Sequence, residues 1–332
     1  MIRAPERSFG GRRILVTGGA GFVGSALTQR LVEAGARVTV LDDLFTGVAD
    51  AIPTGAEFVQ GSVTDADLVD ELVAANSLVF HMAARNIIAS TANPRDDFAT
   101  NIGGTLNILM AARVSKVDRI VYTSSTSVYG NPRSIPINED DGLEVLSPYA
   151  VSKLGGEHYC TAFYESYGLP TACVRYSNVY GPGQRVENPY SGVVAKFMRD
   201  AYMGVPLSVH GDGEQTRDYT FVGDAVEATL AAAIQPRAEG EVFNVGTGIE
   251  TSVNNLGLAI GRALDRPVEL NHIDRRDIDN IRRRVVNIEK ARRMLRWGPQ
   301  VTLENGLAET ASWFVQREAV SRVPAGTAGS SE

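Results

Sequence analysis

The sequence predicts an α/β fold: a doubly wound parallel sheet of the Rossmann type, followed by a smaller mixed α/β lobe toward the C-terminus. Short apolar runs and longer amphipathic runs alternate from residue 13 to about 176, as they do in βαβ units. The first apolar run leads into a glycine-rich turn. With 332 residues, of which 44% are hydrophobic, the chain can bury the cores of two lobes.

The expected elements follow this alternation in order. Strands are expected over residues 13–17, 37–41, 57–60, 78–81, 119–124 and 171–176. Helices are expected over residues 22–34, 65–74, about 95–114 and 149–167. The third helix follows Asn93-Pro94, a common helix opening, although Gly103-Gly104 inside it lowers the helix propensity.

Beyond Asn178 the pattern changes, because prolines and glycines mark loops and the elements become shorter. A segment at about 221–248 is expected to return to the sheet and to add a strand over 241–245. The expected organisation is a sheet domain over 10–176 with this return segment, a second lobe over 177–220 and the mostly helical 249–317, and a disordered tail over 318–332.

The glycine turn after the first strand is the strongest local motif. Gly18, Gly19, Gly21 and Gly24 match the G-x-G-x-x-G spacing, between an apolar strand and a helix start. Glycine permits positive φ and lets a pyrophosphate approach the backbone, while the N-terminus of the helix points toward the phosphates. The turn therefore predicts a dinucleotide-binding site in the sheet domain.

An acidic pair, Asp42-Asp43, ends the second expected strand, about 20 residues after the glycines. A carboxylate at this point accepts hydrogen bonds from the adenosine ribose hydroxyls and repels a 2′-phosphate. We therefore expect NAD to be bound in preference to NADP. The alternative interpretation is that both aspartates form only a solvated strand end.

Tyr149 and Lys153 are four residues apart, on one face of an expected helix. Tyrosine has a pKa of about 10 in water, but a neighbouring ammonium and an oxidised nicotinamide would favour the phenolate. Ser125 follows the strand at 119–124 and so lies at the carboxyl edge of the sheet, where ligands bind. The three residues form a candidate acid–base site, although Tyr-x-x-x-Lys alone is equally typical of an ordinary amphipathic helix.

Composition excludes several other classes of protein. The net charge of −7 argues against nucleic acid as a partner, and no apolar run is long enough for a transmembrane helix. The N-terminal residues lack the apolar region of a secretory signal. Cys160 and Cys173 are expected to be buried thiols, and the four histidines do not cluster. We expect a cytoplasmic protein without a metal or a membrane partner.

Taken in order, these motifs resemble the extended short-chain dehydrogenase/reductase family, specifically its nucleotide-sugar epimerase and dehydratase branch. The similar blocks lie between about Arg13 and Phe314, at residues 17–24, 79–84, 124–130, 147–153, 175–182, 211–219 and 243–246. The resemblance implies that Tyr149 is the base, that Lys153 binds the nicotinamide ribose and that Ser125 is the assisting hydroxyl. It also implies NAD as the cofactor and a nucleotide-diphosphate sugar as the substrate.

The motifs and the resemblance together give two sets of binding residues. The cofactor set is Gly18, Gly21, Phe22, Val23, Gly24, Asp42, Asp43, Leu44, Thr46, Gly47, Ser62, Val63, Met82, Ala83, Ala84, Asn101, Thr123, Tyr149, Lys153 and Tyr176. The substrate set is Arg85, Ser125, Thr126, Tyr149, Asn178, Val193, Arg217 and Arg276.

Arg217 is expected to clamp the diphosphate, because a guanidinium fork matches phosphate oxygens. The alternative is a surface pair with Asp218 or Asp224. The sequence departs from the family at two places. Ser62 stands where an aspartate usually contacts adenine, and the usual Arg-Pro-Gly-Asp is replaced by residues 275–280, where Arg276 or Arg275 would contact phosphate. The arginines at positions 282, 283, 284, 292 and 293 are expected to form a solvated helix face.

The expected reaction is NAD-dependent 4-epimerisation of a UDP-hexose or UDP-hexuronate through a transient 4-keto sugar. Within the family, dehydratases carry an Asp-Glu pair after the catalytic hydroxyl and decarboxylases carry a Glu at the second position. Here Thr126 and Ser127 stand at those positions, and neither is an acid–base group near neutral pH. The alternatives are a 4,6-dehydratase, a UDP-glucuronate decarboxylase and, in another class, a non-catalytic NAD-binding sensor.

A homodimer is implied by the resemblance, because family members pair the helices expected here at about 95–114 and 149–167. Small residues on these helices, including Gly104, Ala111 and Ala112, would permit close approach of the two copies.

Overall fold

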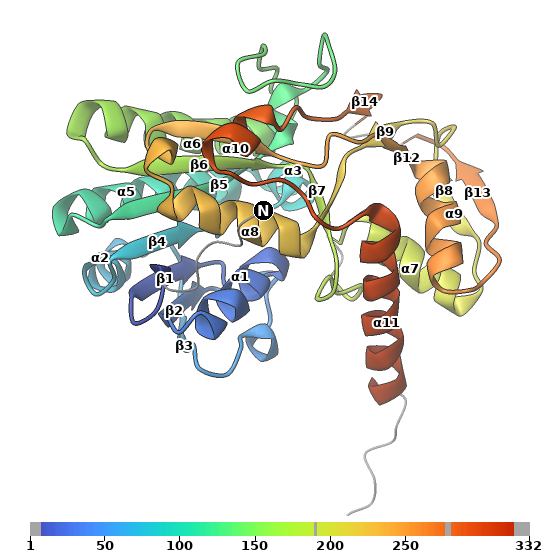
Figure 1. Cartoon of the computed structure of the whole chain (residues 1–332), viewed down its shortest axis with the longest axis horizontal. Helices are drawn as coiled ribbons and strands as arrows, with labels where there is room; N and C mark the ends of the chain where they lie inside the picture. Colours follow the sequence, from blue (N-terminus) through green and yellow to red (C-terminus); the bar gives the residue numbers. More distant parts are fainter. Residues whose placement is uncertain (1–7, 189–190, 276–279, 322–332) are drawn as a thin grey trace, which may run out of the picture.

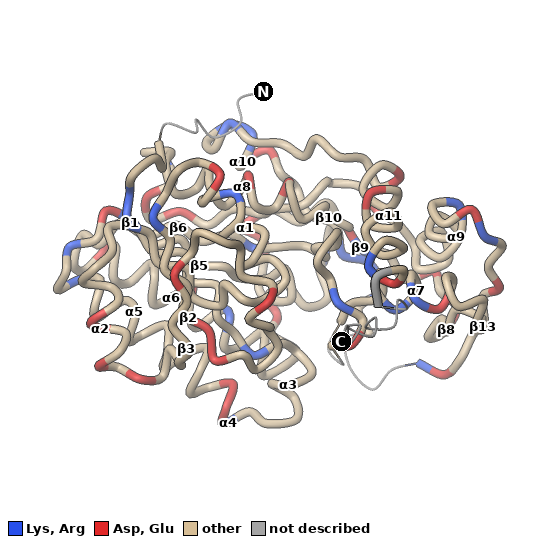
Figure 2. Tube along the Cα trace, turned by 90° about the horizontal axis from the view of Figure 1, so that it is seen from below, with Lys and Arg blue, Asp and Glu red and all other residues tan. Residues whose placement is uncertain are grey.

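The computed structural model describes residues 8–188, 191–275 and 280–321 of the chain. Two lobes lie side by side: a large sheet flanked by helices, and a smaller lobe that contains α7, α9 and α11 (Figure 1). No helix among the described residues is both long and apolar enough to cross a membrane. Basic and acidic residues are interspersed along the chain (Figure 2).

The large lobe is built on a seven-stranded parallel sheet with the order β11-β6-β5-β4-β1-β2-β3. Its strands are β1 Arg13–Thr17, β2 Arg37–Asp42, β3 Glu57–Gln60, β4 Leu78–His81, β5 Arg119–Ser125, β6 Thr171–Tyr176 and β11 Glu241–Val245. The direction in which strands are added reverses between β1 and β4, which creates a ligand-binding crevice at their carboxyl ends. The predicted α/β Rossmann-type fold is confirmed.

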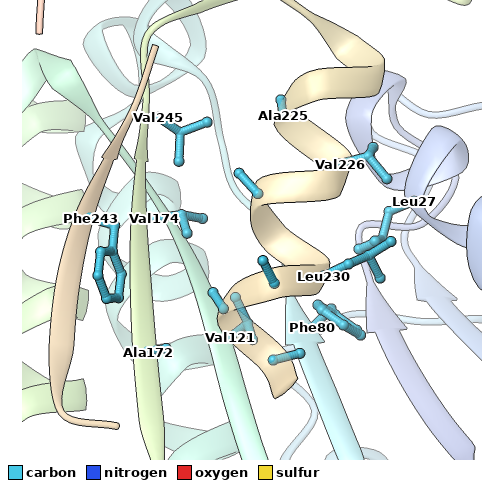
Figure 3. Packing of buried hydrophobic residues seen from close by; sticks show 14 of the residues in the cluster. Leu27, Phe80, Val121, Ala172, Val174, Ala225, Val226, Leu230, Phe243 and Val245 are labelled. Atoms are coloured by element: carbon cyan, nitrogen blue, oxygen red, sulfur yellow. The ribbon is translucent and has the colours of Figure 1, made fainter. Parts of the chain in front are cut away.

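Helices cover both faces of this sheet. One face carries α1 Phe22–Glu33, α8 Val222–Ile234 and α10 Glu289–Met294; the other carries α2 Ala66–Ala74, α5 Gly104–Ser115 and α6 Pro148–Tyr167. Alternate strand residues supply the two cores, as when Val40 packs on the first face and Leu41 on the second. Leu230 of α8 lies over the first face, near Phe80 and Val121 (Figure 3).

The helix expected over about 95–114 is interrupted. The chain forms α3 Ile87–Ala92, α4 Pro94–Asp97, a π-helical segment η3 Phe98–Gly103 and then α5. The Asn93 side chain caps α4 by accepting a hydrogen bond from Asp96 N. π-Helical turns often occur at functional sites, and this one carries Asn101.

The smaller lobe packs three helices around short strands. Its helices are α7 Val193–Met203, α9 Val253–Ala263 and α11 Leu303–Ser321, and its strands are β7 Asn178–Tyr180, β8 Leu207–His210, β9 Thr216–Arg217, β10 Tyr219–Phe221, β12 Thr251–Ser252, β13 Leu270–Ile273 and β14 Arg283–Arg284. Phe197, Leu256 and Phe314 lie in its core. Short helical turns η2 Ala49–Ala51, η4 Thr126–Tyr129 and η5 Pro236–Ala238 complete the described elements.

Two expectations for the C-terminal region need correction. Residues 249–317 contain β12, β13 and β14 and are therefore less helical than expected. Within this range, residues from Val286 to Trp297 pack against the sheet domain, because Ile288, Ala291 and Leu295 are buried in its first core. Helix α11 continues to Ser321, past residue 318, where a disordered tail was expected to begin. Residues 322–332 lie outside the described residues.

A buried ion pair fixes α6 on the sheet. The Arg175 guanidinium on β6 lies 2.7 Å from the Glu157 carboxylate on α6, and the two side chains are only 5% and 3% exposed. Arg175 also donates hydrogen bonds to the Tyr129 hydroxyl and the Glu139 carbonyl. This pair lies two turns along the helix from Tyr149, so it sets where the start of α6 meets the sheet.

Glu157→Leu should therefore lower the free energy of unfolding by about 3–5 kcal/mol, because it leaves a buried guanidinium without its carboxylate. Chemical denaturation measures the loss. Adding Arg175→Met should recover most of it, since the uncompensated charge is then gone. Glu289→Leu, at the exposed pair with Arg292, is the matched control and should change stability by less than about 1 kcal/mol. Equal losses in the buried and the exposed variants would contradict this role.

Candidate active site

The glycine turn has the geometry that a bound dinucleotide requires. Gly18 has a φ of +71°, and a Cβ at this position would lie 2.7 Å from Ala83 N. A Cβ at Gly24 would lie 2.1 Å from the Gly18 carbonyl oxygen. Gly21 caps α1 without a side chain, so the first N–H groups of the helix face the turn. Both Gly18 and Gly24 are therefore fixed as glycine by contacts with neighbouring backbone.

A cavity opens beside this turn, and we call it the glycine-turn cavity. It is lined by Gly18, Gly21, Leu41, Asp42, Asp43, Phe45, Thr46, Gly61, Ser62, Val63, Met82, Ala83, Ala84, Arg85 and Thr100. Most of these residues belong to the predicted cofactor set, and Ser62 is among them. Sequence reasoning missed Leu41, Phe45, Gly61 and Thr100.

Asp42 is buried at the end of β2 and is not a solvated strand end. Its Oδ2 accepts a hydrogen bond from Ala20 N at 2.9 Å, and its Oδ1 accepts one from Leu44 N at 2.8 Å. Burial raises the pKa of the Asp42 carboxyl, and these two backbone bonds oppose the shift. Each oxygen keeps a further lone pair, so the carboxylate can still accept ribose hydroxyls.

Arg85, which was expected to contact the substrate, lines the glycine-turn cavity. Its guanidinium lies 2.8 Å from Asp43 Oδ2 and 2.6 Å from Asp96 Oδ2, and stacks 4.1 Å from the centre of the Phe45 ring. Asn101 fixes the backbone of Arg85, because its Oδ1 accepts from Arg85 N at 2.7 Å and its Nδ2 donates to the Arg85 carbonyl. The Arg85 guanidinium is thus held in the wall of the glycine-turn cavity.

Ser125 and Tyr149 come together at the carboxyl edge of the sheet. Ser125 ends β5 and accepts a hydrogen bond from Ser127 N at 3.1 Å. Tyr149 lies in the first turn of α6, which the Ser147 hydroxyl caps by accepting from Ala150 N. The Ser125 hydroxyl, as a hydrogen-bond partner, lowers the pKa of the Tyr149 phenol. The candidate base and its candidate assisting hydroxyl therefore lie at the same edge of the sheet.

The surroundings of Tyr149 act on its pKa in opposite directions. Their net effect raises the pKa to about 12: burial is the largest cause and raises it, the Ser125 hydrogen bond lowers it, the Asp97 carboxylate raises it and the Arg284 guanidinium lowers it. Asp97 is buried, and its Oδ1 accepts hydrogen bonds from Ser90, Asn101 and Ser152. Sequence reasoning identified neither Asp97 nor Arg284 as part of this site.

The Lys153 ammonium contacts the end of β5 and not the Tyr149 hydroxyl with which it was expected to act. Its Nζ donates to the Thr123 carbonyl at 2.6 Å and lies 4.8 Å from the centre of the Tyr122 ring. Burial lowers the pKa of Lys153 to about 8. The ammonium therefore holds the end of β5, next to Ser125. The described cation that favours the Tyr149 phenolate is Arg284.

A second cavity lies beside this pair, and we call it the Ser127 cavity. It is lined by Ile87, Ser127, Asn131, Leu146, Ser147, Asn280, Ile281 and Arg284. Arg284 is 4% exposed, although the arginine run at 282–284 was expected to be a solvated helix face. The last two residues of the run form strand β14, and within the run only Arg282 and Arg283 are exposed.

Arg217 is also buried, which excludes the surface pair. Its Nη1 donates to the carbonyls of Ile281 and Thr216, both at 2.8 Å, and Ile281 lines the Ser127 cavity. Asp218 instead accepts hydrogen bonds from Thr247 and Gly248. Arg217 is thus hydrogen-bonded to a residue that lines the Ser127 cavity.

The remaining predicted residues are distributed around the two cavities. Asn178 begins β7, and its N–H donates to the Asp218 carbonyl. The Tyr176 hydroxyl is hydrogen-bonded to Thr229, and Thr126 is buried at the start of η4. Val193 begins α7. Arg276 lies outside the described residues, and Arg275 is exposed.

Comparison with known proteins agrees with this geometry. Residues 14–246 match the model of the NAD dependent epimerase/dehydratase family. The chain is 39% identical to the UDP-glucose 4-epimerase of Mycolicibacterium smegmatis, over 91% of this chain and 98% of that protein. It is 34% identical to the UDP-N-acetyl-alpha-D-glucosaminuronate decarboxylase of Bacillus cytotoxicus, over 92% of this chain and 99% of that protein.

A solved structure extends the similarity to three dimensions. The UDP-glucose 4-epimerase of Thermus thermophilus, determined as a complex with NAD, matches with a TM-score of 0.85 and 34% identity over 91% of this chain and 99% of that one. The glycine turn with Gly18 against Ala83, and the buried Asp42, fit the same cofactor. The chain belongs to the NAD dependent epimerase/dehydratase family.

Proposed function

We propose that this protein is an NAD-dependent 4-epimerase of a nucleotide-diphosphate sugar, acting on a UDP-hexose or a UDP-hexuronate. The observation that supports it best is the placement of Ser125 at the end of β5 and of Tyr149 in the first turn of α6, at the strand edge where the glycine-turn cavity also opens. The similarity to UDP-glucose 4-epimerases supports the same reaction.

In this proposal Tyr149 accepts the proton of the C4 hydroxyl and Ser125 orients the reacting oxygen. NAD, when bound, supplies a reversible hydride acceptor. Lys153 keeps the end of β5 in place through the Thr123 carbonyl, so Ser125 stays beside the base. Arg217 would anchor the diphosphate. The 4-keto sugar then presents its other face, and Tyr149 returns the proton.

The in-family alternatives require an acid–base group near C5 or C6 of the sugar. Thr126 and Ser127 follow Ser125 directly and carry hydroxyls, which are poor acids and bases near neutral pH. The Asp97 carboxylate is buried, and its Oδ1 already accepts three hydrogen bonds, so it is a poor candidate for an acid–base group that contacts the sugar. The sensor alternative requires a lost catalytic residue, whereas Ser125, Tyr149 and Lys153 are all present.

Incubation with UDP-glucose, UDP-glucuronate and dTDP-glucose should convert at least one of them to a stereoisomer of unchanged mass. Mass spectrometry and chromatography of the products measure this outcome. Tyr149→Phe removes only the proton-accepting oxygen and should lower kcat by about a hundredfold or more. A product that has lost water or carbon dioxide would replace the epimerase proposal with a dehydratase or a decarboxylase.

Asp42→Ala should weaken NAD binding by about tenfold or more and narrow the preference for NAD over NADP, because the ribose loses its carboxylate partner. Equilibrium binding to cofactor-free protein measures both dinucleotides. The control is Asp67→Ala, at an exposed position on α2. It has the same net charge as Asp42→Ala and should bind NAD and NADP as the wild type does. Tighter binding of NADP than NAD by the wild type would disprove the ribose argument.

We also propose a homodimer built on α5 and α6. Of the small residues expected at this contact, Gly104, Ala111 and Ala112 are buried within the sheet domain, whereas Gly103 is half-buried and Ala162 is exposed. Larger apolar side chains are exposed on the same helices: Met110, Val114, Val151 and Tyr159. Their exposure supports the pairing of these two helices with a second copy.

Light scattering at micromolar concentration should therefore give the mass of a dimer. Met110→Asp combined with Val151→Asp should shift it to the mass of a monomer, because two carboxylates would be buried in each half of the contact. Leu258→Asp, at an exposed apolar position on α9 of the smaller lobe, is the control and should leave the dimer intact. A monomeric wild type would rule out the dimer.

A cytoplasmic location is also part of the proposal. Cys160 and Cys173 are both buried free thiols. Thiols of this kind are typical of proteins from reducing compartments.

A further inference from the structure

Three consecutive arginines, Arg282 and the two residues of β14, have different surroundings. Arg282 lies 2.7 Å from Asp212, and Arg283 bonds Glu250; both arginine side chains are 55% exposed. Arg284 is 4% exposed and lines the Ser127 cavity. Arg282 and Arg283 thus face solvent, whereas Arg284 faces the cavity beside Ser127.

The backbone holds Arg284 firmly from both lobes. In the smaller lobe, β14 pairs with β9 in a register that places Arg284 opposite Arg217. Directly after β14, the chain pairs with Ile137: Ile137 N donates to the Val285 carbonyl at 2.9 Å, and Asn287 N donates to the Ile137 carbonyl at 2.8 Å. Main-chain hydrogen bonds to both lobes therefore fix the backbone from which the Arg284 side chain extends.

A series of polar contacts links Arg284 to the base. Its Nη1 lies 3.5 Å from Ser127 Oγ, and Ser125 Oγ lies 3.1 Å from the same oxygen. Ser125 is in turn hydrogen-bonded to Tyr149. A guanidinium can only donate, so Arg284 requires Ser127 Oγ to accept. The orientation of the Ser127 hydroxyl then constrains that of Ser125.

We propose that Arg284 is a positioning residue that acts through Ser127 to hold Ser125 and Tyr149 in the arrangement in which Tyr149 accepts the substrate proton. The proposal rests on the proposed role of Tyr149 as the base.

Charge supports this assignment independently of position. The charged groups that act on Tyr149 are Asp97, at the end of α4, and Arg284. Lys153 lies one turn further along α6 than Tyr149. Burial and Asp97 raise the pKa of Tyr149, whereas Arg284 lowers it. Loss of the guanidinium should therefore raise the pKa of Tyr149, and less phenolate would be present at any given pH.

The test compares Arg284→Met with Arg283→Met, which removes the same charge from the neighbouring exposed position. We expect Arg284→Met to lower kcat about tenfold or more at neutral pH and to move the acidic limb of the kcat profile about one unit higher. KM should change less than about threefold, and bound NAD should stay at the wild-type level. Arg283→Met should match the wild type, and Arg284→Lys should restore most of the pH profile.

Two further measurements test whether Arg284 acts through Ser127, and they do not depend on the folding of a single variant. Ser127→Ala leaves the guanidinium charge in place but breaks the contact, so it should lower kcat with little shift of the acidic limb. In the Arg284→Met background Ser127→Ala should lower kcat no further, because the same contact is already broken. Titration of the phenolate absorbance, with Tyr149→Phe subtracted, should show the higher pKa of Tyr149 in Arg284→Met without turnover.

A raised KM with an unshifted pH profile would make Arg284 a substrate ligand and overturn the proposal. Multiplying effects of Arg284→Met and Ser127→Ala would overturn the route through Ser127. Full activity of Tyr149→Phe would instead disprove the proposed base, which is a failure of the proposed function that the Arg284 variants alone would not produce.

Discussion

The partial burial of Tyr149 is the constraint on which the site depends. A phenol partly removed from water loses some of the solvation of its anion, so its pKa rises and it becomes a weaker candidate base at neutral pH. The fold offsets this with a hydrogen bond from Ser125 and the charge of Arg284, against the opposing charge of Asp97. These two groups offset only part of the effect, so the pKa of Tyr149 stays raised, at about 12. The positive charge of an oxidised nicotinamide would lower it.

Burial of this kind requires that the surrounding elements be rigid. Helix α6 is fixed at its start by the Ser147 cap and two turns later by the ion pair of Glu157 with Arg175. Lys153 ties the same helix to the Thr123 carbonyl at the end of β5, which carries Ser125. The helix and the strand are thus joined at the level of the reacting groups, and neither can shift without breaking buried polar contacts.

Local requirements could be predicted from the sequence, and contacts between distant segments could not. The glycine turn, Asp42 and the place of Ser125 at a strand end follow from spacing, because backbone conformation and strand ends are local properties. The contacts of Arg85 with Asp43 and Asp96 could not be predicted, because these partners come from separate segments. Arg284 was misplaced because a strand of two residues has no detectable period, so nothing distinguishes it from its exposed neighbours.

The pairing of β14 with β9 bears on how the proposed reaction could proceed. Arg217 and Arg284 are opposite each other on this ladder, so the group proposed to anchor the diphosphate and the group proposed to position the base share one rigid support. The Ile137 contacts join that support to the sheet domain. Closure of the two lobes along this line would break main-chain hydrogen bonds, each costly to leave unmade. The 4-keto sugar would therefore turn within a fixed cavity, held by its diphosphate, while the catalytic pair stays in place.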